Sequence, residues 1–437
     1  MNIVLLSGGS GKRLWPLSND IFSKQFIRIF KTDEGEYESM IQRVYRQIRS
    51  AAPDSQVLIA TGKSQIPAIN NQVGSDVRIC AEPCRRDTFP AIALAASYLR
   101  DVSGVPEEEA VVICPVDPYV DDSYFQKLNE MWESAGRGDA NLVLMGVAPS
   151  YPSEKYGYII PQDPGEDGRV REFKEKPDSE TAAGYIAAGA LWNGGVFACK
   201  IQYLLERARE LTGCSDYHEL YQRYETLPSI SFDYAVVEKE PDIRVMRYEG
   251  CWKDVGTWNT LSEVMEENCI GTAVQDPACE NVHIVNNLDI PVLCMGLKDA
   301  VISAGPDGIL VSDKERSSYI KPYVDQFDQQ AAYAEKSWGS FRVMDVEDES
   351  MTIKITLNRG HRMNYHSHRH RDEVWTVISG RGRTIVDGME QPVEPGDVVT
   401  IQAGCRHTII ADTELKVIEV QLGKEINVND KQKFSLE

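Results

Sequence analysis

The sequence predicts an α/β protein in which a mixed, mostly parallel sheet flanked by helices is followed by β structure. First, short apolar runs alternate with longer helical stretches up to about residue 265, the pattern of a sheet covered by helices. Second, short β-like pieces separated by Asn, Asp and Gly turns then replace this alternation. Third, apolar and polar residues alternate from residue 336 onward, which is typical of strands with one buried face.

The first domain is expected over residues 1–265. Its expected strands are 3–6, 57–60, 111–114 and 142–145, and its clearest helices are 88–100 and 123–135. Ligands of such sheets bind at the carboxyl ends of the strands. A glycine-rich turn after the first strand and Asp117 after the strand 111–114 both stand at such ends, so we expect them to lie close together.

Two further domains are expected, both built from strands. A small β linker domain over residues 266–335 contains the strand-like pieces 282–285, 292–295 and 300–303. The third domain is expected over residues 336–437. Its period-two strands and the turns Asp387-Gly388 and Pro395-Gly396 predict an all-β barrel or jelly roll.

Length and composition are those of a soluble protein with two or three domains. The chain has 437 residues, 42% of them hydrophobic and 26% charged, and holds no apolar run near the roughly 20 residues that cross a membrane. The net charge of −21 argues against nucleic-acid binding, which depends on clustered Lys and Arg. The ten cysteines show no CxxC pair and no signal peptide is apparent, so we expect reduced thiols, a cytoplasmic protein and no membrane partner.

The clearest chemical signal is the glycine-rich turn after the first strand. Gly8, Gly9 and Gly11 let the backbone aim N–H groups at a ligand, a geometry that suits phosphate oxygens. Two cations, Arg13 and Lys24, follow in the sequence, so a polyphosphate ligand is indicated. The turn matches neither the Walker A motif, in which Ser or Thr follows Gly-Lys, nor the dinucleotide fingerprint with its third glycine. A plain turn without a ligand is the alternative.

The turn and the segments after it resemble a known family. The run GGSGKRLWPLS, followed by SKQF, resembles the signature of sugar nucleotidyltransferases, and its LWPLS part is most similar to mannose-1-phosphate guanylyltransferases. Further segments follow in that family's order: EPCRRDTFPAIALAA (82–96), ICPVDPYV (113–120), YGYI (156–159), FKEKP (173–177), WNGGVF (192–197), SFDYAVVEK (231–239) and WKDVGTW (252–258). The resemblance implies a Rossmann-like nucleotidyltransferase domain that joins a sugar 1-phosphate to a nucleoside triphosphate and releases pyrophosphate.

The resemblance also implies which residues handle the phosphates. Arg13 and Lys24 are expected to contact the triphosphate, and Asp117 and Asp254 match the two positions that hold magnesium, Mg²⁺, in the family. Mg²⁺ commonly takes one or two carboxylates together with substrate phosphates. These four residues form the expected catalytic set, although Pro118 stands where the family usually has His. Nucleotide contacts are expected from Leu6, Gly8, Gly9, Gly11, Glu82, Arg86, Asp87 and Thr88.

The sugar phosphate is assigned a second set of residues by the same resemblance. Lys176 is expected to contact the phosphate, while Glu175, Asn193 and the backbone at Gly157 contact the sugar. Carboxylate and amide groups suit sugar hydroxyls, and a lysine suits a dianion. The alternative is that residues 174–176 are an ordinary solvated charge run.

The nucleotide base is expected to be guanine, with one departure from the family. Guanylyltransferases typically have Asn where this chain has Asp87. A carboxylate only accepts hydrogen bonds, whereas an amide also donates them. GTP is therefore the expected donor, with CTP or another nucleotide, and a sugar 1-phosphate other than mannose 1-phosphate, as alternatives.

Five of the seven histidines lie between residues 361 and 407. His366 and His368 would share one face of a strand. With Glu373 and His407 they stand at spacings that resemble the two cupin motifs, whose three histidines and one glutamate hold a divalent transition metal, Zn²⁺ or another, inside a barrel. In the second motif Gln402 and Ala411 replace the usual Pro and Asn.

Guanylyltransferases fused to a cupin resemble this whole arrangement and carry phosphomannose isomerase activity. Their Arg-x-Glu-His-Trp run is matched by Arg371, Glu373 and Trp375, but Val374 replaces the His. The alternatives for the barrel are therefore an isomerase and a metal-free domain used for dimerisation.

The sequence thus predicts a magnesium-dependent nucleotidyltransferase, with GDP-mannose as the expected product and a homodimer as the expected assembly. One alternative is a bifunctional enzyme whose cupin interconverts mannose 6-phosphate and fructose 6-phosphate. Another is a regulatory protein that binds nucleotide sugars without turnover. Retention of Arg13, Lys24, Asp117 and Asp254 argues against the last, because a binding module need not keep both metal carboxylates.

Overall fold

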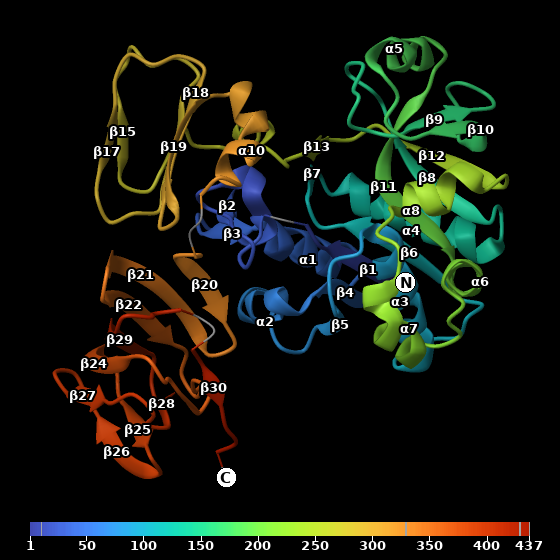
Figure 1. Cartoon of the computed structure of the whole chain (residues 1–437). Coiled ribbons are helices and arrows are strands. Elements are labelled where there is room, and N and C mark those ends of the chain that lie inside the picture. Colours follow the sequence, from blue (N-terminus) through green and yellow to red (C-terminus); the bar gives the residue numbers. More distant parts are fainter. Residues whose placement is uncertain (10, 328–329, 428–429, 437) are drawn as a thin grey trace. The chain divides into compact units, whose positions relative to one another are not determined.

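The computed structural model describes residues 1–9, 11–327, 330–427 and 430–436, and the described chain forms two compact units. The first unit comprises residues 1–9, 25–256 and 263–266, and the second comprises 10–24, 257–262 and 267–437. Figure 1 labels their elements along the chain. The expected linker and barrel belong to the same unit, and the predicted domain boundaries at 265 and 335 stay predictions.

A mixed sheet forms the centre of the first unit, in the order β5-β4-β1-β6-β11-β8-β12-β10-β9. The strands of this unit are β1 (Asn2–Ser7), β2 (Arg28–Lys31), β3 (Tyr37–Ser39), β4 (Gln56–Gly62), β5 (Arg78–Glu82), β6 (Ala110–Pro115), β7 (Pro118–Val120), β8 (Leu142–Val147), β9 (Tyr158–Pro161), β10 (Gly168–Lys174), β11 (Leu191–Lys200), β12 (Ile243–Tyr248) and β13 (Trp252–Asp254). The pairs β2-β3 and β7-β13 form separate small sheets.

The direction of the strands divides this sheet. Strands β5, β4, β1 and β6 pair in parallel, and so do β8 and β12. Strand β11 lies between these groups and is antiparallel to both β6 and β8. The expected strands 3–6, 57–60, 111–114 and 142–145 are confirmed as β1, β4, β6 and β8, and the mixed character of the sheet is confirmed.

Helices connect the strands of the first unit. They are α1 (Met40–Ala51), α2 (Ile66–Val73), α3 (Thr88–Asp101), α4 (Ser123–Arg137), α5 (Ser179–Ala187), α6 (Ile201–Thr212), α7 (Tyr217–Arg223) and α8 (Phe232–Ala235), with short 3-10 turns η2 (Lys24–Phe26), η3 (Lys63–Gln65), η4 (Tyr224–Thr226) and η5 (Val237–Lys239). Helix α1 begins with a reciprocal capping box between Ser39 and Gln42, which satisfies two backbone donors. Helices α3 and α4 confirm the two expected helices.

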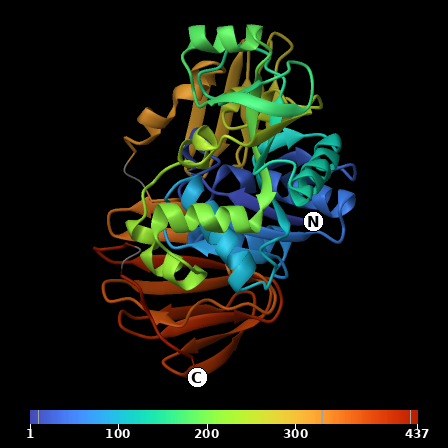
Figure 2. The ribbon, with the colours of Figure 1, turned by 90° about the vertical axis from the view of Figure 1, so that its right-hand side faces the viewer.

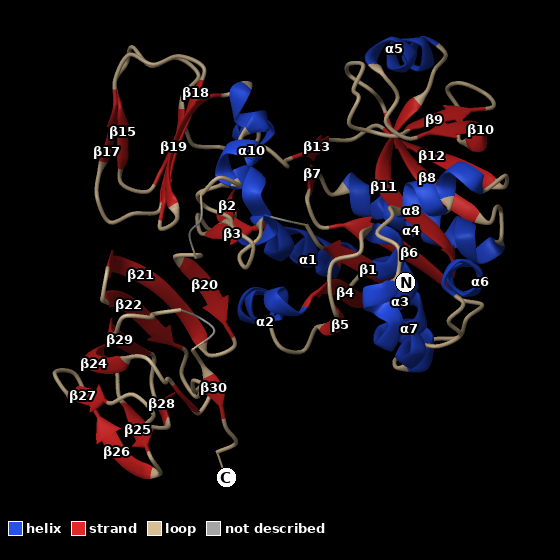
Figure 3. Ribbon diagram, in the orientation of Figure 1, coloured by secondary structure: helices blue, strands red, loops and turns tan. Residues whose placement is uncertain are grey.

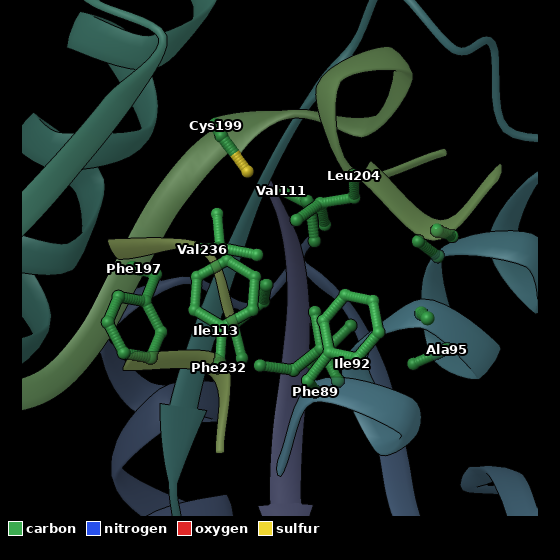
Figure 4. Close-up of a cluster of buried hydrophobic side chains, with 14 of the residues drawn as sticks. Phe89, Ile92, Ala95, Val111, Ile113, Phe197, Cys199, Leu204, Phe232 and Val236 are labelled. Atoms are coloured by element: carbon green, nitrogen blue, oxygen red, sulfur yellow. The ribbon is translucent and has the colours of Figure 1, made fainter. Parts of the chain in front are cut away.

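One hydrophobic core joins α3, α6 and α8 to the sheet. Figure 4 shows Phe89 and Ile92 of α3 facing Ile113 of β6, with Phe197 of β11 and Phe232 of α8 beside them. These side chains are nearly or fully buried, and each contributes about 1.5–3 kcal/mol by leaving water. The core therefore holds the strand ends of β6 and β11, and the residues that follow them, in fixed positions.

In the second unit, the short helix α9 (Trp258–Ser262) is followed by a region of short, mostly parallel strands, here called the β linker region. Its elements are β14 (Cys269–Ile270), β15 (Ala273–Gln275), β16 (His283–Asn286), β17 (Val292–Cys294), β18 (Ala300–Gly305), β19 (Gly308–Asp313), η6 (Arg316–Tyr319) and α10 (Lys321–Val324). Strands β14, β16 and β18 pair in parallel, as do β15 and β17. At Gly271, where φ is +81°, a Cβ would lie 2.0 Å from the Asn286 carbonyl oxygen, so only glycine fits this turn. The expected strands 282–285, 292–295 and 300–303 are confirmed.

Two facing sheets form the rest of the second unit. One has the order β20-β21-β22-β29-β24-β27 and the other β26-β25-β28-β23-β30. Their strands are β20 (Tyr333–Lys336), β21 (Gly339–Glu347), β22 (Ser350–Leu357), β23 (His366–Ser367), β24 (Asp372–Ser379), β25 (Gly382–Val386), β26 (Met389–Val393), β27 (Val398–Ile401), β28 (His407–Ala411), β29 (Leu415–Leu422) and β30 (Gln432–Lys433). Figure 3 shows this region as strands and loops, and its orange-to-red strands lie together in Figure 2.

The core between these two sheets confirms the predicted jelly roll. Trp375 and Val417 of one sheet share it with Val393 and Ile409 of the other. The predicted turn Asp387-Gly388 joins β25 to β26 with φ of 46° and 81°, the positive values that a two-residue hairpin turn needs.

Among the described residues, no helix has both the length and the apolar character needed to cross a membrane.

Candidate functional site

The glycine turn and Asp117 stand side by side at the edge of the first unit's sheet. Strands β1 and β6 are parallel neighbours in which Leu6 pairs with Pro115, and the Val116 N–H donates to the Leu6 carbonyl at 3.3 Å. Gly8 and Asp117 each lie two residues beyond this pair, so the register brings their backbones together. Gly8 and the following glycine are exposed, and apart from their chain neighbours no atom of the described residues lies within 4 Å of where a Cβ of either would be.

Asp254 is brought to the same place by a small two-stranded sheet. Strands β7 and β13 are antiparallel, and Asp254 pairs with Pro118, the residue after Asp117. Burial raises the pKa of the Tyr156 phenol, and the negative charges of Asp254 and Asp117 raise it further. Both carboxylates therefore lie near the same side chain. Two carboxylates on neighbouring backbone positions supply the oxygen ligands that Mg²⁺ prefers. The donor set therefore fits magnesium with substrate phosphates as the remaining ligands.

The other two residues of the expected catalytic set lie in the segment 10–24 of the second unit. Arg13 is exposed on the 3-10 turn η1 (Gly11–Leu14), while the neighbouring Lys12 is paired with Asp325 at 2.8 Å. Lys24 is half-buried and directly precedes Gln25. The side chain of Gln25 donates to the Ser7 hydroxyl at the end of β1, at 3.1 Å.

The same segment contains a structural anchor that sequence reasoning missed. The indole N–H of Trp258 donates to the carbonyl of Trp15 at 3.0 Å. A Cβ on Gly308 would lie only 2.5 Å from the Trp15 ring, so the indole packs directly on the backbone of β19. The Leu-Trp-Pro part of the motif therefore packs this segment against β19 in the β linker region.

The other residues expected to contact the nucleotide, besides Leu6 and the glycine turn, lie between the carboxyl end of β5 and the start of α3. Glu82 is buried and accepts a hydrogen bond from the Tyr224 hydroxyl at 2.7 Å, and burial raises its pKa. Arg86 donates to the carbonyl of Glu225. Asp87, with φ of 68°, accepts from the Thr88 N–H at 2.7 Å and caps α3. The Asp87 carboxylate is exposed beside this cap.

The residues expected to contact the sugar phosphate are brought together by β9, β10 and β11. Lys176 pairs with the buried carboxylate of Glu175 at 2.7 Å. A Cβ on Gly157 would lie 2.5 Å from Glu175 Oε2, so glycine at this position lets that carboxylate approach. The Asn193 N–H donates to the Gly157 carbonyl at 2.8 Å, and its Nδ2 donates to Asp233 Oδ1 at 2.7 Å. Asp233 is a further carboxylate in contact with these residues, and sequence reasoning missed it.

The four expected cupin ligands converge in the jelly roll. One ligand atom from each of His366, His368, Glu373 and His407 lies within 4.8 Å of the others, and all four residues are buried. Strand register explains the convergence, because His366 on β23 pairs with His407 on β28. Glu373 on β24 reaches the imidazoles of His368 and His407 at 3.1 and 3.2 Å.

The hydrogen bonds of the three imidazoles orient them for a cation. In each ring Nδ1 contacts a backbone carbonyl: that of Asn364 for His366, Asp430 for His368 and Cys405 for His407. A carbonyl only accepts hydrogen bonds, so each Nδ1 carries a proton and Nε2 is the ring nitrogen that faces the cluster. This backbone support of metal-ligating histidines is the usual arrangement, and the donor set therefore fits a divalent transition metal.

Charge around the cluster supports the same assignment. Burial lowers the pKa of His366 to about 2, with further lowering by Lys431 and His407, so its imidazole is neutral. Burial alone would raise the pKa of Glu373, yet hydrogen bonds with His368 and His407 hold it well below its usual range. A charged carboxylate is the form of Glu373 that binds metal.

Two ionisable side chains beside the cluster were missed by sequence reasoning. Glu419 is buried on β29, and its pKa is raised to about 8 by burial and by the charge of Glu373. Burial lowers the pKa of Lys431 to about 8. The alternation along β29 was the available signal, because it places Glu419 and Gln421 on the inward face.

Comparison with known proteins agrees with both kinds of domain. The nucleotidyl transferase family model matches residues 2–269, and the cupin domain model matches residues 353–421. A putative mannose-1-phosphate guanylyltransferase of Vibrio cholerae is 28% identical over 99% of this chain and 98% of its own length. The mannose-1-phosphate guanylyltransferase of Escherichia coli is 27% identical over 99% and 97%. The alginate biosynthesis protein AlgA of Pseudomonas aeruginosa is 28% identical over 98% and 95%.

A solved structure shares the fold of the larger part of the chain. The Thermus thermophilus protein described as mannose-1-phosphate geranyltransferase is 28% identical, with a TM-score of 0.62, and covers 74% of this chain and 98% of its own.

Proposed function

We propose that this chain, which belongs to the nucleotidyl transferase family, joins mannose 1-phosphate to GTP, forming GDP-mannose and releasing pyrophosphate. The observation that carries the proposal is the register of β1, β6, β7 and β13, which gathers the glycine turn, Asp117 and Asp254 at one edge of the sheet. The sugar and the base are taken from the printed names of the nearly full-length relatives.

The proposed site works through charge and position. Asp117 and Asp254 would hold Mg²⁺, which supplies charge neutralisation on the phosphates. The amides of Gly8, Gly9 and Gly11 donate to phosphate oxygens. The guanidinium of Arg13 forms a bidentate contact with the triphosphate, and the Lys24 ammonium adds a point charge. The oxygen of the sugar phosphate then attacks the α-phosphorus in line with the departing pyrophosphate, whose charge these cations stabilise.

The second substrate is assigned to the residues that β9, β10 and β11 bring together. Lys176 neutralises the phosphate of mannose 1-phosphate, while Glu175, Asn193 and the backbone at Gly157 contact the sugar. The contacts among these residues support the assignment, because they order the carboxylate and the ammonium before a ligand arrives.

The base is assigned to the residues at the start of α3, with Glu82, Arg86, Asp87 and Thr88 around it and Leu6 beneath the nucleotide. The backbone N–H of Thr88 is already bound by Asp87. The Asp87 carboxylate accepts from the amino and imino groups of guanine, but it accepts equally from the amino group of cytosine. GTP is therefore the proposed donor and CTP its competitor.

A substrate screen tests the proposal directly. Purified protein is mixed with each nucleoside triphosphate and each of several sugar 1-phosphates, with and without Mg²⁺, and pyrophosphate release is followed. We expect magnesium-dependent turnover that is fastest with GTP and mannose 1-phosphate. Turnover that is faster with CTP than with GTP would contradict the proposed specificity for guanine. Binding without turnover for every pair of substrates would favour the regulatory alternative. Light scattering on the same sample tests the expected homodimer.

For the cupin we propose a bound divalent transition metal, Zn²⁺ or a similar ion, on His366, His368, Glu373 and His407. The buried convergence of these side chains supports it. Isomerisation of mannose 6-phosphate and fructose 6-phosphate is the second candidate activity, and it is tested by a coupled assay on the metal-loaded protein. If the metal-loaded protein shows no isomerisation, the cupin binds a metal but lacks isomerase activity.

A further inference from the structure

We propose that Asp121 sets the spacing of Asp117 and Asp254, the two carboxylates assigned to magnesium, by fixing the register of β7 against β13. Asp121 is a positioning residue, because it acts on the metal site through the two strands and not by contact with the metal or a substrate. The inference rests on the proposed function, since it concerns how the metal carboxylates of that site are held. It is carried by the hydrogen bonds of Asp121 at the far end of this sheet.

The sheet that positions the two carboxylates is short. Strands β7 and β13 are three residues long each, and they pair with one another as a separate sheet (Figure 1). A two-stranded ribbon is at best marginally stable by itself. A slip by one residue would move Asp254 about 3.3 Å along β7 and turn its side chain to the other face. The position of Asp254 next to Asp117 therefore depends on what holds the register.

Asp121 joins the two strands at the end of the sheet away from Asp117. It directly follows β7, and its Oδ2 accepts a hydrogen bond at 2.7 Å from the N–H of Cys251, the residue before β13. Continuing the antiparallel ladder by one residue places Cys251 opposite Asp121. The side chain thus bridges the strands where the backbone pairing ends, and a slip of one strand along the other would break this bond.

The Asp121 carboxylate is itself fixed by further donors. Its Oδ1 accepts from the Ser123 N–H at 2.9 Å, from the Ser123 hydroxyl and from the Tyr248 hydroxyl at 3.1 Å. Burial raises the pKa of Asp121, but the hydrogen bonds from Ser123, Cys251 and Tyr248 outweigh burial and lower the pKa below its usual value. The carboxylate is therefore charged, and hydrogen bonds to a charged acceptor are stronger than those between neutral groups.

These donors belong to elements of the main body of the first unit. Tyr248 is the last residue of β12, is buried, and has its ring 5.6 Å from that of Tyr124 on α4. Ser123 is the first residue of α4. A Cβ on Gly250 would lie 2.6 Å from the Ser123 hydroxyl and would also collide with the Tyr248 hydroxyl, so glycine lets the chain pass close to this cluster. Asp121 therefore ties β13 to a helix and a strand that are held by the core.

The spacing of the two carboxylates matters because of the metal. Mg²⁺ demands near-ideal octahedral geometry with oxygens at about 2.0–2.1 Å, so two ligands on different strands bind it well only in one register. Ligands that the protein holds in place before the metal arrives bind more tightly than loosely held ones. Loss of the Asp121 bond should therefore weaken Mg²⁺ binding although Asp117 and Asp254 are both retained.

The first test compares two substitutions of Asp121 in the full chain. Asp121→Ala should raise the Mg²⁺ concentration needed for half-maximal pyrophosphate release about 10- to 100-fold, as expected for hydrogen bonds to a charged group. Saturating Mg²⁺ should restore most of kcat, and the KM for mannose 1-phosphate should then stay within about twofold of wild type. Asp121→Asn keeps an oxygen that accepts from the Cys251 N–H, so it should restore most of the Mg²⁺ affinity.

Hydrogen exchange provides a second measurement that does not require turnover. In wild type titrated with Mg²⁺ alone, the backbone amides of residues 251–254 should exchange more slowly as the metal binds. The Mg²⁺ concentration that gives half of this protection should rise in Asp121→Ala by about the same factor as in the rate assay. Tyr248→Phe removes one hydrogen bond to Asp121 and should shift both values in the same direction by a smaller factor. If Asp121→Ala does not fold, the absence of any shift in Tyr248→Phe would contradict the inference.

Asp139→Ala is the matched control. Asp139 is half-buried like Asp121 and follows the other end of α4, where it accepts from the Ser134 hydroxyl at 2.8 Å and from Arg137 Nη2 at 2.9 Å. Its loss should lower Tm and leave both Mg²⁺ measurements unchanged. An unchanged Mg²⁺ dependence in folded Asp121→Ala, or an equal shift in Asp139→Ala, would overturn the inference while leaving the proposed function intact. If wild type shows no turnover, the proposed function fails, and the inference stands only if Mg²⁺ protects the wild-type amides and Asp121→Ala shifts that protection.

Discussion

Replacing Glu373 by alanine should empty the cupin of metal and destabilise the second unit. The Glu373 carboxylate is 2% exposed. It contacts His368 Nε2 at 3.1 Å, Arg371 Nε at 3.1 Å, His407 Nε2 at 3.2 Å and Trp375 Nε1 at 3.2 Å. Its removal takes away the anionic member of the ligand set His366, His368, Glu373 and His407. It also leaves the guanidinium of Arg371 without this carboxylate partner.

The size of the effect follows from these contacts. Removing one partner of a buried ion pair costs about 3–5 kcal/mol, and for a unit of this size each kcal/mol lowers Tm by roughly 2–4 °C. The metal-free variant should therefore melt about 6–20 °C below metal-free wild type. Wild type should gain further stability from metal, about 2.7 kcal/mol when the free ion is at 100 times its Kd, and the variant should gain none.

The assay combines elemental analysis with thermal unfolding in chelator and in added Zn²⁺. The control is Glu414→Ala, because Glu414 is an exposed acid of the same jelly roll that forms a surface pair with Lys416 at 3.1 Å. The control should keep its metal and its Tm within a few degrees, since exposed pairs contribute about 0–1 kcal/mol. Wild-type metal content in Glu373→Ala, or an unchanged rise of Tm with Zn²⁺, would refute the proposed site.

Three other measurements address the remaining parts of the chain. Asp254→Ala should reduce pyrophosphate release at least about 100-fold with unchanged circular dichroism, because it removes one of two proposed metal carboxylates; a near-normal rate would exclude it from the site. Gly157→Ala should raise the KM for the sugar phosphate roughly tenfold, since its Cβ would lie 2.5 Å from Glu175 Oε2 and must displace that carboxylate; an unchanged KM would show that Glu175 does not contact the sugar. Burial and Lys314 lower the pKa of His283 to about 4 from its usual 6.5. The unfolded state therefore binds the extra proton, and the stability of the second unit should fall as the pH drops from about 6.5 towards 4; His283→Gln should flatten this dependence in thermal unfolding, and an equally steep loss would assign it to other groups.

The strands of the first unit could be predicted because uninterrupted apolar runs in the sequence indicate buried strands. The runs 57–60, 111–114 and 142–145 are apolar at every position, and the structure buries all of them, as a central strand requires. The antiparallel direction of β11 could not be predicted in the same way. An apolar run shows that a strand is buried on both faces, but the direction is decided by the connections and by the neighbours with which it pairs.

The two candidate sites differ in how much of each could be predicted from residues alone. His366 and His368 are two apart, so a strand places both on one face, and the spacing to Glu373 and His407 completes the set. Asp233 offered no comparable signal, because an acid near the start of a short helix is most often a cap. Its distinguishing contact, with Asn193, joins residues 40 apart in sequence and arises only when α8 packs beside β11.

The motif between the glycine turn and Lys24 combines two physical requirements. Arg13 is exposed and suited to a ligand, whereas Trp15, two residues later, is fixed by the Trp258 indole and by the backbone at Gly308. An exposed arginine acts on a phosphate at modest entropic cost only if the backbone that carries it is already ordered. The anchor at Trp15 provides that order, which explains why the cation and the tryptophan occur in one short segment. A substitution that enlarges Gly308 should accordingly weaken triphosphate binding without touching any residue that contacts the nucleotide.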